Sequence, residues 1–408
     1  MWPKDNNPTK PYVVYYQNQF ELPLDVVSSQ VDLMGQYLGI PVTGAPIVPL
    51  ISRFAINPSI GPIFWLGASY EDNWPNYYAI QSLTAPTTFS GSWAFLVNAT
   101  LGQNSVGRWT TAGSVAGNLG RIYAVSGASW SNYITGVNTT IATQTAKLIS
   151  DYPGGLPTGS VVVIHCGINE MQFGGNLIGG GIFSTDGTTV TWAQSGFTMP
   201  ANLANINVTV TNSAQCVAGA NNLVFVNGLY LMTVQAVPDG THITLTNSFN
   251  NTQGTVVAAG NMQAYSATTI AANITAAQTG ITNLISAGVS QIYFVICPNL
   301  GQLPNFSGQA ALATTTWNYW KTQAKASLYP NTAKQVAVFD VSAVTNNIVT
   351  NPTNYGFKDA TTQWNNSVTI NQNDLLFFDG FHQNAPGHVE IAHQFFSTIR
   401  NRSYLSLY

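Results

Sequence analysis

Two short runs of almost uninterrupted apolar residues constrain the fold of this chain more than any other feature. They span residues 161–166 and 292–297, and Pro298 stops the second. Strands that are apolar on both sides are typical of a parallel sheet whose two faces are covered by helices. A short apolar run at 62–66 and the segment 335–341 also indicate strands. We therefore expect these four segments to be strands of one buried sheet.

Segments with helical periodicity alternate with these strands. The clearest is 268–287, which Gly288 ends, as glycine commonly does after a helix. Alternation of strands and helices predicts a three-layer α/β/α architecture with a parallel central sheet. The other expected helices span 74–83, 309–328 and 386–400, the last with Pro386 in its first turn.

One block, from residue 175 to 265, interrupts this alternation. It shows little helical periodicity, and Pro238-Asp239-Gly240 has the composition of a turn between two strands. We interpret it as an all-β subdomain inserted into an α/β domain formed by 61–174 and 266–408. Its texture resembles small β modules of phage tail and capsid-associated proteins. The strands expected in it span 206–210, 223–226, 230–237 and 242–246.

Residues 1–60 are rich in proline and only weakly periodic, apart from a candidate short helix at 25–37. We expect an extended arm. Such an arm is suited to packing on a neighbouring copy or within a virion or appendage assembly.

Charged residues make up only 7% of the 408 residues, whereas 45% are hydrophobic and the formal net charge is −3. High apolar content with little net charge argues against disorder. The absence of a basic face argues against nucleic-acid binding. A surface built from Gly, Asn, Thr and Ser suits an extracellular, cell-surface or virion protein. No run has the length of a membrane span, and the first residues lack a signal-peptide pattern, so a signal was removed or export uses another route.

The cysteines and most of the histidines predict no metal or cofactor site. Three cysteines without a C-x-x-C pair are best interpreted as buried free thiols. Four of the five histidines have no second ligand at metal-site spacing, so we expect structural roles for them. These are His165, His242, His388 and His393.

Asp379 and His382 stand three residues apart directly after the apolar run 375–378. An acid in this position can hold the imidazole in one orientation, and the imidazole can then act as a general base on a hydroxyl. Such a pair asks for a nucleophile elsewhere in the chain.

Ser69 is the candidate nucleophile. It follows the strand 62–66 and precedes the helix expected at 74–83, where a serine can present its hydroxyl above the sheet edge. The plainer alternative is a helix N-cap. Glu71 and Asp72 are then expected to be first-turn acids without a catalytic role.

Two further strand ends carry groups able to donate to an oxyanion. Gly127, after Ile122–Val125, can expose its backbone N–H, and Asn169, at the end of the strand segment 161–170, can offer a side-chain amide. The alternatives are a tight turn at Gly127 and an Asx turn at Asn169.

The order of these four sites resembles the SGNH, or GDSL-type, hydrolase family. The likeness covers about 62–173 and 267–400 and includes Tyr123–Ala128, Cys297–Pro304 and Asn351–Phe357. The chain departs from the family pattern at Ala68, where the family usually has Asp, which puts the rigidity of the serine turn in doubt. It also departs at Gln383, where Pro is common, and at Glu170, where Asp is common.

The resemblance implies a flavodoxin-like fold and a serine esterase without metal or cofactor. It makes Ser69 the nucleophile, His382 the base and Asp379 the residue that orients it, with an oxyanion hole from Ser69, Gly127 and Asn169. We rank an O-acetylated surface polysaccharide ahead of an acyl lipid as the substrate, because the composition predicts a polar, charge-poor surface without a membrane-binding face. A non-catalytic attachment protein that retains the fold is the remaining alternative. Of the aromatic residues near these motifs, we expect Trp74 and Trp130 to line the substrate cleft.

Overall fold

The computed structural model describes residues 61–72, 92–101, 121–130, 139–173, 267–328, 335–364 and 374–405, with shorter pieces of 103–114 and 176–265. The arm predicted at 1–60, the helices predicted at 25–37 and 74–83, and Trp74 lie outside the described residues.

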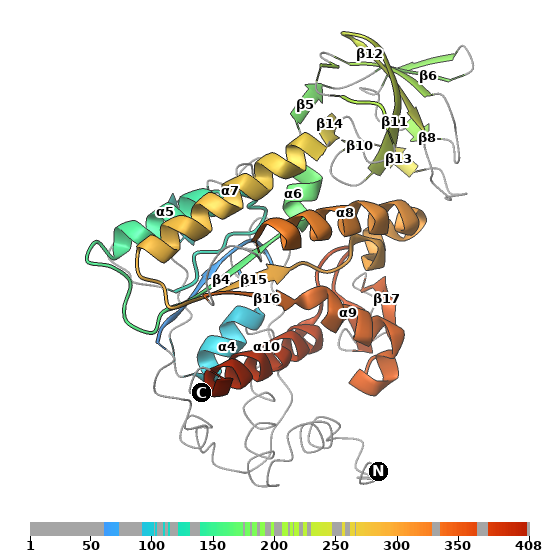
Figure 1. Ribbon diagram of the computed structural model, residues 1–408. Helices are drawn as coiled ribbons and strands as arrows, with labels where there is room; N and C mark the ends of the chain where they lie inside the picture. Colours follow the sequence, from blue (N-terminus) through green and yellow to red (C-terminus); the bar gives the residue numbers. More distant parts are fainter. Residues whose placement is uncertain are drawn as a thin grey trace.

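A four-stranded parallel sheet forms the centre of the molecule (Figure 1). Its strands lie in the order β1 (Ile63–Leu66), β4 (Val161–Cys166), β15 (Gln291–Ile296) and β16 (Val336–Asp340). Every residue of β1 and β4 is buried. The four predicted strands and their parallel arrangement are therefore confirmed, with bounds that differ by at most one residue.

The chain order of these segments changes direction between β1 and β4. A parallel bridge between Trp65 and Ile122 places residues 121–124 on the outer side of β1. The later strands of this sheet, β4, β15 and β16, lie on the other side of β1. In doubly wound sheets, ligands bind outside the carboxyl ends of the strands at such a reversal. The segments that follow β1 and β4 carry Ser69 and Asn169.

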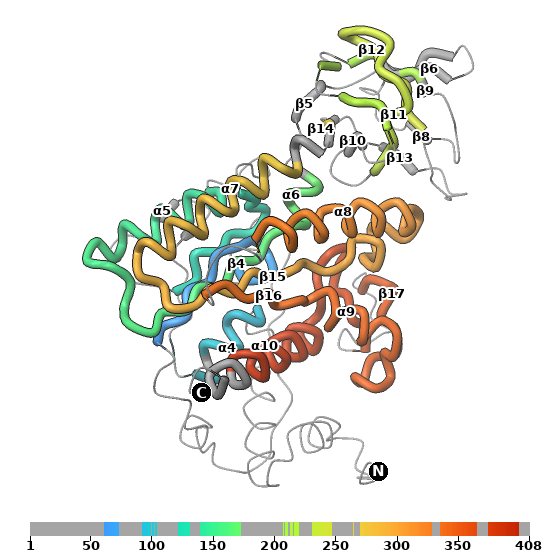
Figure 2. Tube along the Cα trace, viewed as in Figure 1, coloured from blue at the N-terminus to red at the C-terminus, as the bar shows by residue number. Residues whose placement is uncertain are grey.

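Helices cover both faces of the sheet. One face packs against α5 (Ile141–Asp151), α7 (Ala267–Ser286) and α8 (Ala310–Leu328). The other packs against α4 (Trp93–Thr100) and α10 (Ala385–Leu405), which lie side by side although they are far apart in the sequence (Figure 2).

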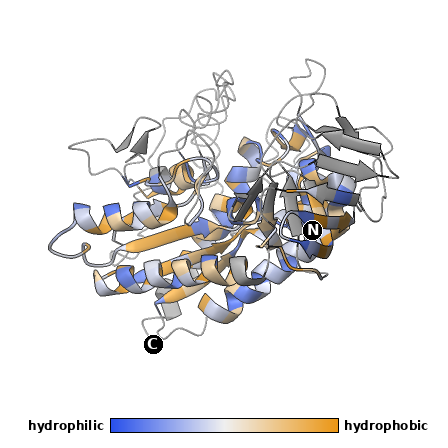
Figure 3. Cartoon of the chain, turned by 90° about the horizontal axis from the view of Figure 1, so that it is seen from above, coloured by the Kyte–Doolittle hydropathy of each residue, from blue (hydrophilic) through white to orange (hydrophobic). Residues whose placement is uncertain are grey.

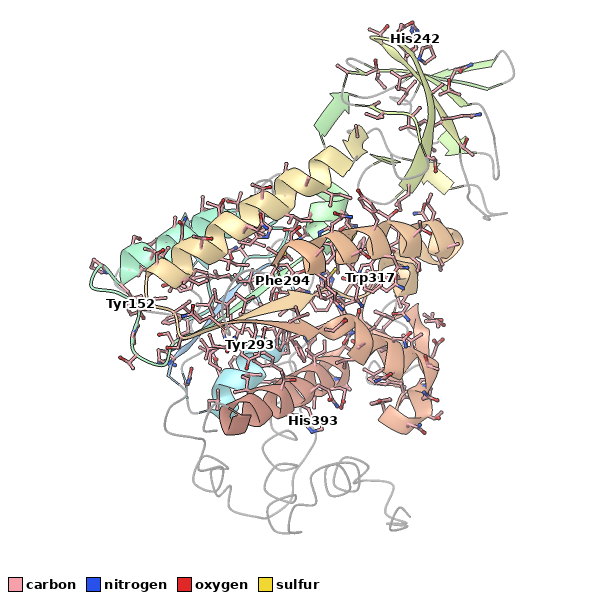
Figure 4. All side chains as sticks on the ribbon, viewed as in Figure 1. Tyr152, His242, Tyr293, Phe294, Trp317 and His393 are labelled. Atoms are coloured by element: carbon pink, nitrogen blue, oxygen red, sulfur yellow. The ribbon has the colours of Figure 1, made fainter. Side chains whose placement is uncertain are left out.

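Successive strand residues point to opposite faces and so supply both cores. Tyr293 packs toward the α10 side and Phe294 toward the α8 side (Figure 4). Seen from above, the sheet strands are hydrophobic along their length while the helices carry both hydrophilic and hydrophobic residues (Figure 3). This pattern is what a sheet buried between two helical layers requires.

Helices α7, α8 and α10 confirm the predicted segments, but four helices were missed. These are α4, α5, α6 (Ile168–Phe173) and α9 (Val341–Thr350). The buried face of α5 consists of Ile141, Gln144, Thr145 and Leu148, so only two of its four buried residues are apolar. Its start is fixed by a capping box between Thr140 and Thr143.

Between α6 (Ile168–Phe173) and α7 the described residues form a separate, antiparallel eight-stranded sheet (Figure 1). The four strands expected in this block are present; the subdomain boundaries at 175 and 265 stay a prediction. In spatial order the strands are β5 (Asn176–Gly179), β14 (Met262–Tyr265), β10 (Leu223–Val226), β11 (Tyr230–Asp239), β12 (His242–Thr246), β9 (Ile206–Thr209), β6 (Ile182–Thr185) and β7 (Thr188–Thr191).

The turn predicted at 238–240 lies further along the chain, at Gly240 and Thr241. Strand β11 runs on to Asp239, and its register with β12 shifts between Ala236 and Asp239. Proline has no N–H for the ladder, so a strand tolerates it where pairing is irregular. Pro238 therefore sits within an irregular strand end, and the prediction of a Pro-containing turn was wrong.

The β-rich sheet is bonded to the α/β body at the start of β11. The Leu231 backbone N–H donates to Oε1 of Gln309 at 2.9 Å, and Gln309 ends the 3₁₀ segment Pro304–Gln309. The Leu231 side chain is 1% exposed and belongs to the core that includes Leu303 and Phe306. One residue of the β-rich block is thus part of the main hydrophobic core.

We expect Leu231→Ala to lower the free energy of unfolding by about 2–4 kcal/mol, because it leaves a cavity in that core. Val217→Ala is the control, since Val217 belongs to the same block but is 53% exposed. Urea unfolding of both variants measures the difference. Equal stability of the two variants would contradict the docking of Leu231.

Candidate active site

Ser69, His382 and Asp379 are in contact in series. The Oγ of Ser69 lies 2.6 Å from Nε2 of His382. The other ring nitrogen, Nδ1, lies 2.9 Å from Oδ2 and 3.0 Å from Oδ1 of Asp379. These distances join residues 69 and 382 across 313 positions of sequence. A hydroxyl, an imidazole and a carboxylate in this order are the parts of a nucleophile activated by an oriented base.

The Asp379 carboxylate also organises its own turn. Its Oδ1 accepts hydrogen bonds from the backbone N–H groups of Phe381 and His382, each at 2.7 Å. The His382 carbonyl accepts from the N–H of Phe378 at 2.8 Å, which closes the turn onto β18 (Leu375–Phe377). The acid therefore fixes both the backbone and the ring of the histidine.

Gln383, which follows this histidine, is fully buried and donates from Nε2 to Oγ1 of Thr345 on α9 at 2.8 Å. The departure from proline at this position thus adds a side-chain link between the histidine turn and a neighbouring helix.

The turn that carries Ser69 is held by a side chain that the sequence interpretation missed. Gln144 of α5 accepts from the Gly67 N–H and donates to the Gly67 carbonyl, both at 2.9 Å. The N–H of Asp72 also closes the turn by donating to the Ala68 carbonyl at 3.0 Å. This clamp answers the doubt raised by Ala68, because the turn is pinned from α5 rather than by a side chain at position 68.

Gly127 lies in a tight turn beside the Ser69 turn. Its φ is +83°, in the region that favours glycine, and the Ala128 N–H donates to the Val125 carbonyl at 3.1 Å. The Val125 N–H donates to the Gly67 carbonyl, and the Ser126 N–H donates to Oδ2 of Asp72. These bonds fasten the Gly127 turn to the Ser69 turn.

Asn169 is joined to the same region from the end of β4. Its Nδ2 donates to the Ala128 carbonyl at 2.9 Å. Among the described residues, nothing accepts a hydrogen bond from the backbone N–H of Ser69 or of Gly127. Ser69 and Gly127 thus lie on two turns bonded to each other, and Asn169 reaches the second of them from α6. Ser69 and Gly127 each keep a backbone donor available among the described residues.

Glu170 of α6 joins the segment after the Gly127 turn to the end of β4. Its carboxylate accepts from the Trp130 N–H at 2.9 Å and from the Gly167 N–H. The side chain is buried, and burial raises its pKa from 4.5 to about 7, although the N–H donors and His165 act in the opposite direction. A carboxyl thus serves as a backbone clamp where the family pattern has the shorter Asp.

Glu71 and Asp72 are fully buried, in contrast to the first-turn acids expected from the sequence. Residues 69–72 form a turn and not a described helix. Oε1 of Glu71 lies 2.5 Å from Nδ1 of His165 and accepts from Nε1 of Trp93 at 2.7 Å. The two acids therefore anchor the serine turn to His165, Trp93 and Ser126. A sequence pattern of adjacent acids cannot separate this role from a solvent-facing one.

The prediction that Trp130 lines a cleft is wrong. Its ring is 1% exposed, and its Nε1 donates to Sγ of Cys166 at 3.3 Å within the core. The Trp130 ring also lies against Gly280 of α7, where it occupies the space that a Cβ at that position would need. The other predicted cleft residue, Trp74, lies outside the described residues.

The cysteines and the four remaining histidines were predicted to have structural roles. All three cysteines are buried free thiols, as expected. His165 pairs with Glu71, and His242 is exposed beside Asp239 at the outer end of the β-rich sheet (Figure 4). His388 and His393 are buried on α10. In the part of the chain that the structure describes, no three His, Cys, Asp or Glu side chains gather as a metal ion requires.

Neither the described helices nor known proteins add a further indication of function. Of the described helices, none combines the length and the apolar character needed to cross a bilayer. The sequence matches no model of a known protein family and no curated protein.

The pKa of Glu170 generates a test that depends on pH. A carboxyl with a raised pKa in the folded state binds more protons than in the unfolded state between pH 4.5 and about 7. Its contribution to the free energy of unfolding therefore declines as pH rises through this range, by about 3 kcal/mol in total.

We expect wild type to lose about that much stability relative to Glu170→Gln between pH 4.5 and pH 8. Other titrating groups, such as His388, are present in both proteins and cancel in the difference between their free energies of unfolding. Urea unfolding of both proteins at several pH values therefore isolates the contribution of Glu170. A difference that stays constant with pH would contradict the raised pKa.

Proposed function

We propose that this chain is a serine esterase of the SGNH type. The proposal depends above all on the contact of Ser69 Oγ with His382 Nε2 at 2.6 Å, continued by Asp379 on the other side of the ring. The arrangement agrees with the roles that the sequence resemblance implied for the same three residues. No metal or cofactor is invoked for the reaction.

In this mechanism His382 takes the Ser69 proton while Oγ attacks the ester carbonyl carbon. The resulting tetrahedral intermediate collapses when the alkoxide leaves and receives the proton from His382. Water, deprotonated by the same imidazole, then attacks the carbonyl carbon of the acyl-serine. The second tetrahedral intermediate collapses when Ser69 Oγ leaves and takes the proton back from His382, which releases the carboxylic acid. Asp379 keeps Nδ1 oriented and stabilises the imidazolium during both steps.

The developing oxyanion would be bound by the backbone N–H groups of Ser69 and Gly127 and by the Asn169 amide. Nδ2 of Asn169 has two protons, and only one is needed for its bond to the Ala128 carbonyl. Donors fixed in advance stabilise the transition state without reorganisation. The hydrogen bonds that join the three turns support this preorganisation.

The strand order supports the flavodoxin-like form of this fold. Residues 121–124, then β1, β4, β15 and β16, lie in the order 2-1-3-4-5 of such sheets. We assign the α/β domain to 61–174 and 266–408 and the inserted β subdomain to 175–265. The proposed active site then lies at the reversal of strand order.

We propose an acylated glycan, in particular an O-acetylated surface polysaccharide, as the substrate. Within the described residues, Val217 is the one large hydrophobic side chain that is exposed, so this part offers no apolar patch for a lipid surface. The charge-poor composition fits an extracellular, cell-surface or virion setting. Acetate release from acetylated glycans, compared with fatty-acid release from phospholipid micelles, distinguishes the two substrate classes.

The proposed nucleophile is tested by covalent labelling. We expect a fluorophosphonate to add one mass increment to the intact wild-type protein, mapped by peptide mass spectrometry to Ser69. Ser69→Ala should show neither labelling nor ester hydrolysis. Ser150→Ala, which removes an exposed hydroxyl of α5, should behave as wild type. An unlabelled wild type would instead favour the alternative of a non-catalytic attachment protein.

A separate prediction concerns the oxyanion donors. Asn169→Ala should lower kcat by about 10²- to 10³-fold, because one preorganised donor is lost. Steady-state hydrolysis of a small acetyl ester measures this effect. An unchanged kcat would remove Asn169 from the oxyanion hole while leaving the nucleophile assignment in place.

A further inference from the structure

Tyr70, the residue after the proposed nucleophile, reaches across to the histidine turn. Its hydroxyl donates a hydrogen bond to the carbonyl oxygen of Phe381 at 2.7 Å. Phe381 immediately precedes His382. The side chain of Tyr70 is 4% exposed, so the bond lies out of bulk water.

Two successive residues of one turn therefore bind two successive residues of the other. Ser69 contacts the His382 ring, and Tyr70 contacts the backbone one position earlier. A single contact between two turns permits rotation about it, whereas two contacts fix both separation and orientation. Reacting groups need this kind of control, because a misplacement of about 1 Å can cost roughly a hundredfold in rate.

The Tyr70 ring is itself packed in place by three imidazoles. Its centroid lies 5.3 Å from that of His165 and 5.7 Å from those of His382 and His388. His165 is held by Glu71, and Nδ1 of His388 accepts from the Trp93 N–H at 3.3 Å. The phenol is thus a rigid spacer between buried side chains.

Both Tyr70 and its neighbour His388 keep a single protonation state near pH 7. Burial lowers the pKa of His388 to about 3, helped by His382 and His165, so that ring stays neutral near pH 7. Burial also raises the pKa of Tyr70 well above its ordinary value, with Asp379 acting in the same direction. The hydroxyl therefore remains a donor wherever the enzyme would work.

We propose that Tyr70 is a positioning residue for the base: its hydroxyl holds the backbone at Phe381 so that the His382 ring stays against Ser69 Oγ. This inference rests on the proposed esterase function, since it concerns the same site. It assigns no contact with substrate to Tyr70.

Other contacts on the histidine turn leave a specific task for this bond. The N–H of Asn305 donates to the Gly380 carbonyl at 3.1 Å, and Phe381 packs edge-on against Phe306 at 5.9 Å. Both contacts come from the Pro304–Gln309 segment and tie the turn to that segment. The Tyr70 bond instead ties the backbone of this turn to the residue that follows the proposed nucleophile.

The test compares two substitutions that each remove one buried phenol oxygen. Tyr70→Phe keeps the ring among the three imidazoles and removes only the bond to Phe381. Tyr123→Phe is the matched control, because Tyr123 is also buried and its hydroxyl donates to Oδ2 of Asp151 at 2.8 Å. Circular dichroism melting sets an assay temperature at which all three proteins are folded.

We measure the rate constant for fluorophosphonate labelling of Ser69 and the kcat and KM for a small acetyl ester. The expected result is a roughly tenfold to hundredfold loss in labelling rate and in kcat for Tyr70→Phe, with KM unchanged. Tyr123→Phe should keep wild-type rates. A purely structural role would instead lower the melting temperatures of both variants and leave kcat at its wild-type value.

The outcomes separate the two proposals. If wild type is labelled at Ser69 and Tyr70→Phe reacts at the wild-type rate, the positioning role is overturned and the esterase stands. If both variants lose rate equally, the effect is not specific to the Phe381 bond and the positioning role is again overturned. If wild type is not labelled at Ser69, the esterase fails and the role of Tyr70 fails with it.

Discussion

The common direction of the strands in the central sheet is the constraint on which the proposed site depends. Because β1 and β4 are parallel neighbours, the segments after Leu66 and Cys166 leave the sheet at the same edge. Ser69 and Asn169 are brought to one region by this geometry alone. His382 comes from another part of the chain, after β18, and needs its own connections to reach the same place.

Those connections are mostly hydrogen bonds from side chains to turn backbones. Gln144 holds Gly67, Asp72 holds Ser126, and Glu170 holds Trp130 and Gly167. A buried backbone N–H needs a partner, and a carboxylate is a strong one. In a chain with only 15 acidic residues, Glu71, Asp72 and Glu170 are nevertheless buried around these turns. Several of the few acidic side chains thus fix buried turns of the backbone.

Much of the fold was predictable because its strongest signals are local. Uninterrupted apolar runs identified the central strands, and the helical spacing in 268–287 identified α7. Helix α5 escaped because Gln144 and Thr145 stand on its buried face, and Gln144 is buried to hold another segment. The contact of Ser69 with His382 was expected from the order of motifs, whereas the link from Tyr70 to Phe381 joins positions 311 apart with no sequence pattern to indicate it. Trp130 was misassigned because closeness to a motif in sequence does not distinguish a core ring from a cleft ring.

The attachment of the β-rich sheet has a mechanical consequence. Its chain enters from α6 and leaves into α7, and Leu231 adds a third point of support at Gln309. The entry and exit strands, β5 and β14, are neighbours, and a body held by two adjacent strands alone can swing. The contact at Leu231 lies on a different strand, β11, and so resists this motion. Force applied near His242 would accordingly reach the segment Pro304–Gln309, which is bonded to Gly380, as well as the connecting strands β5 and β14.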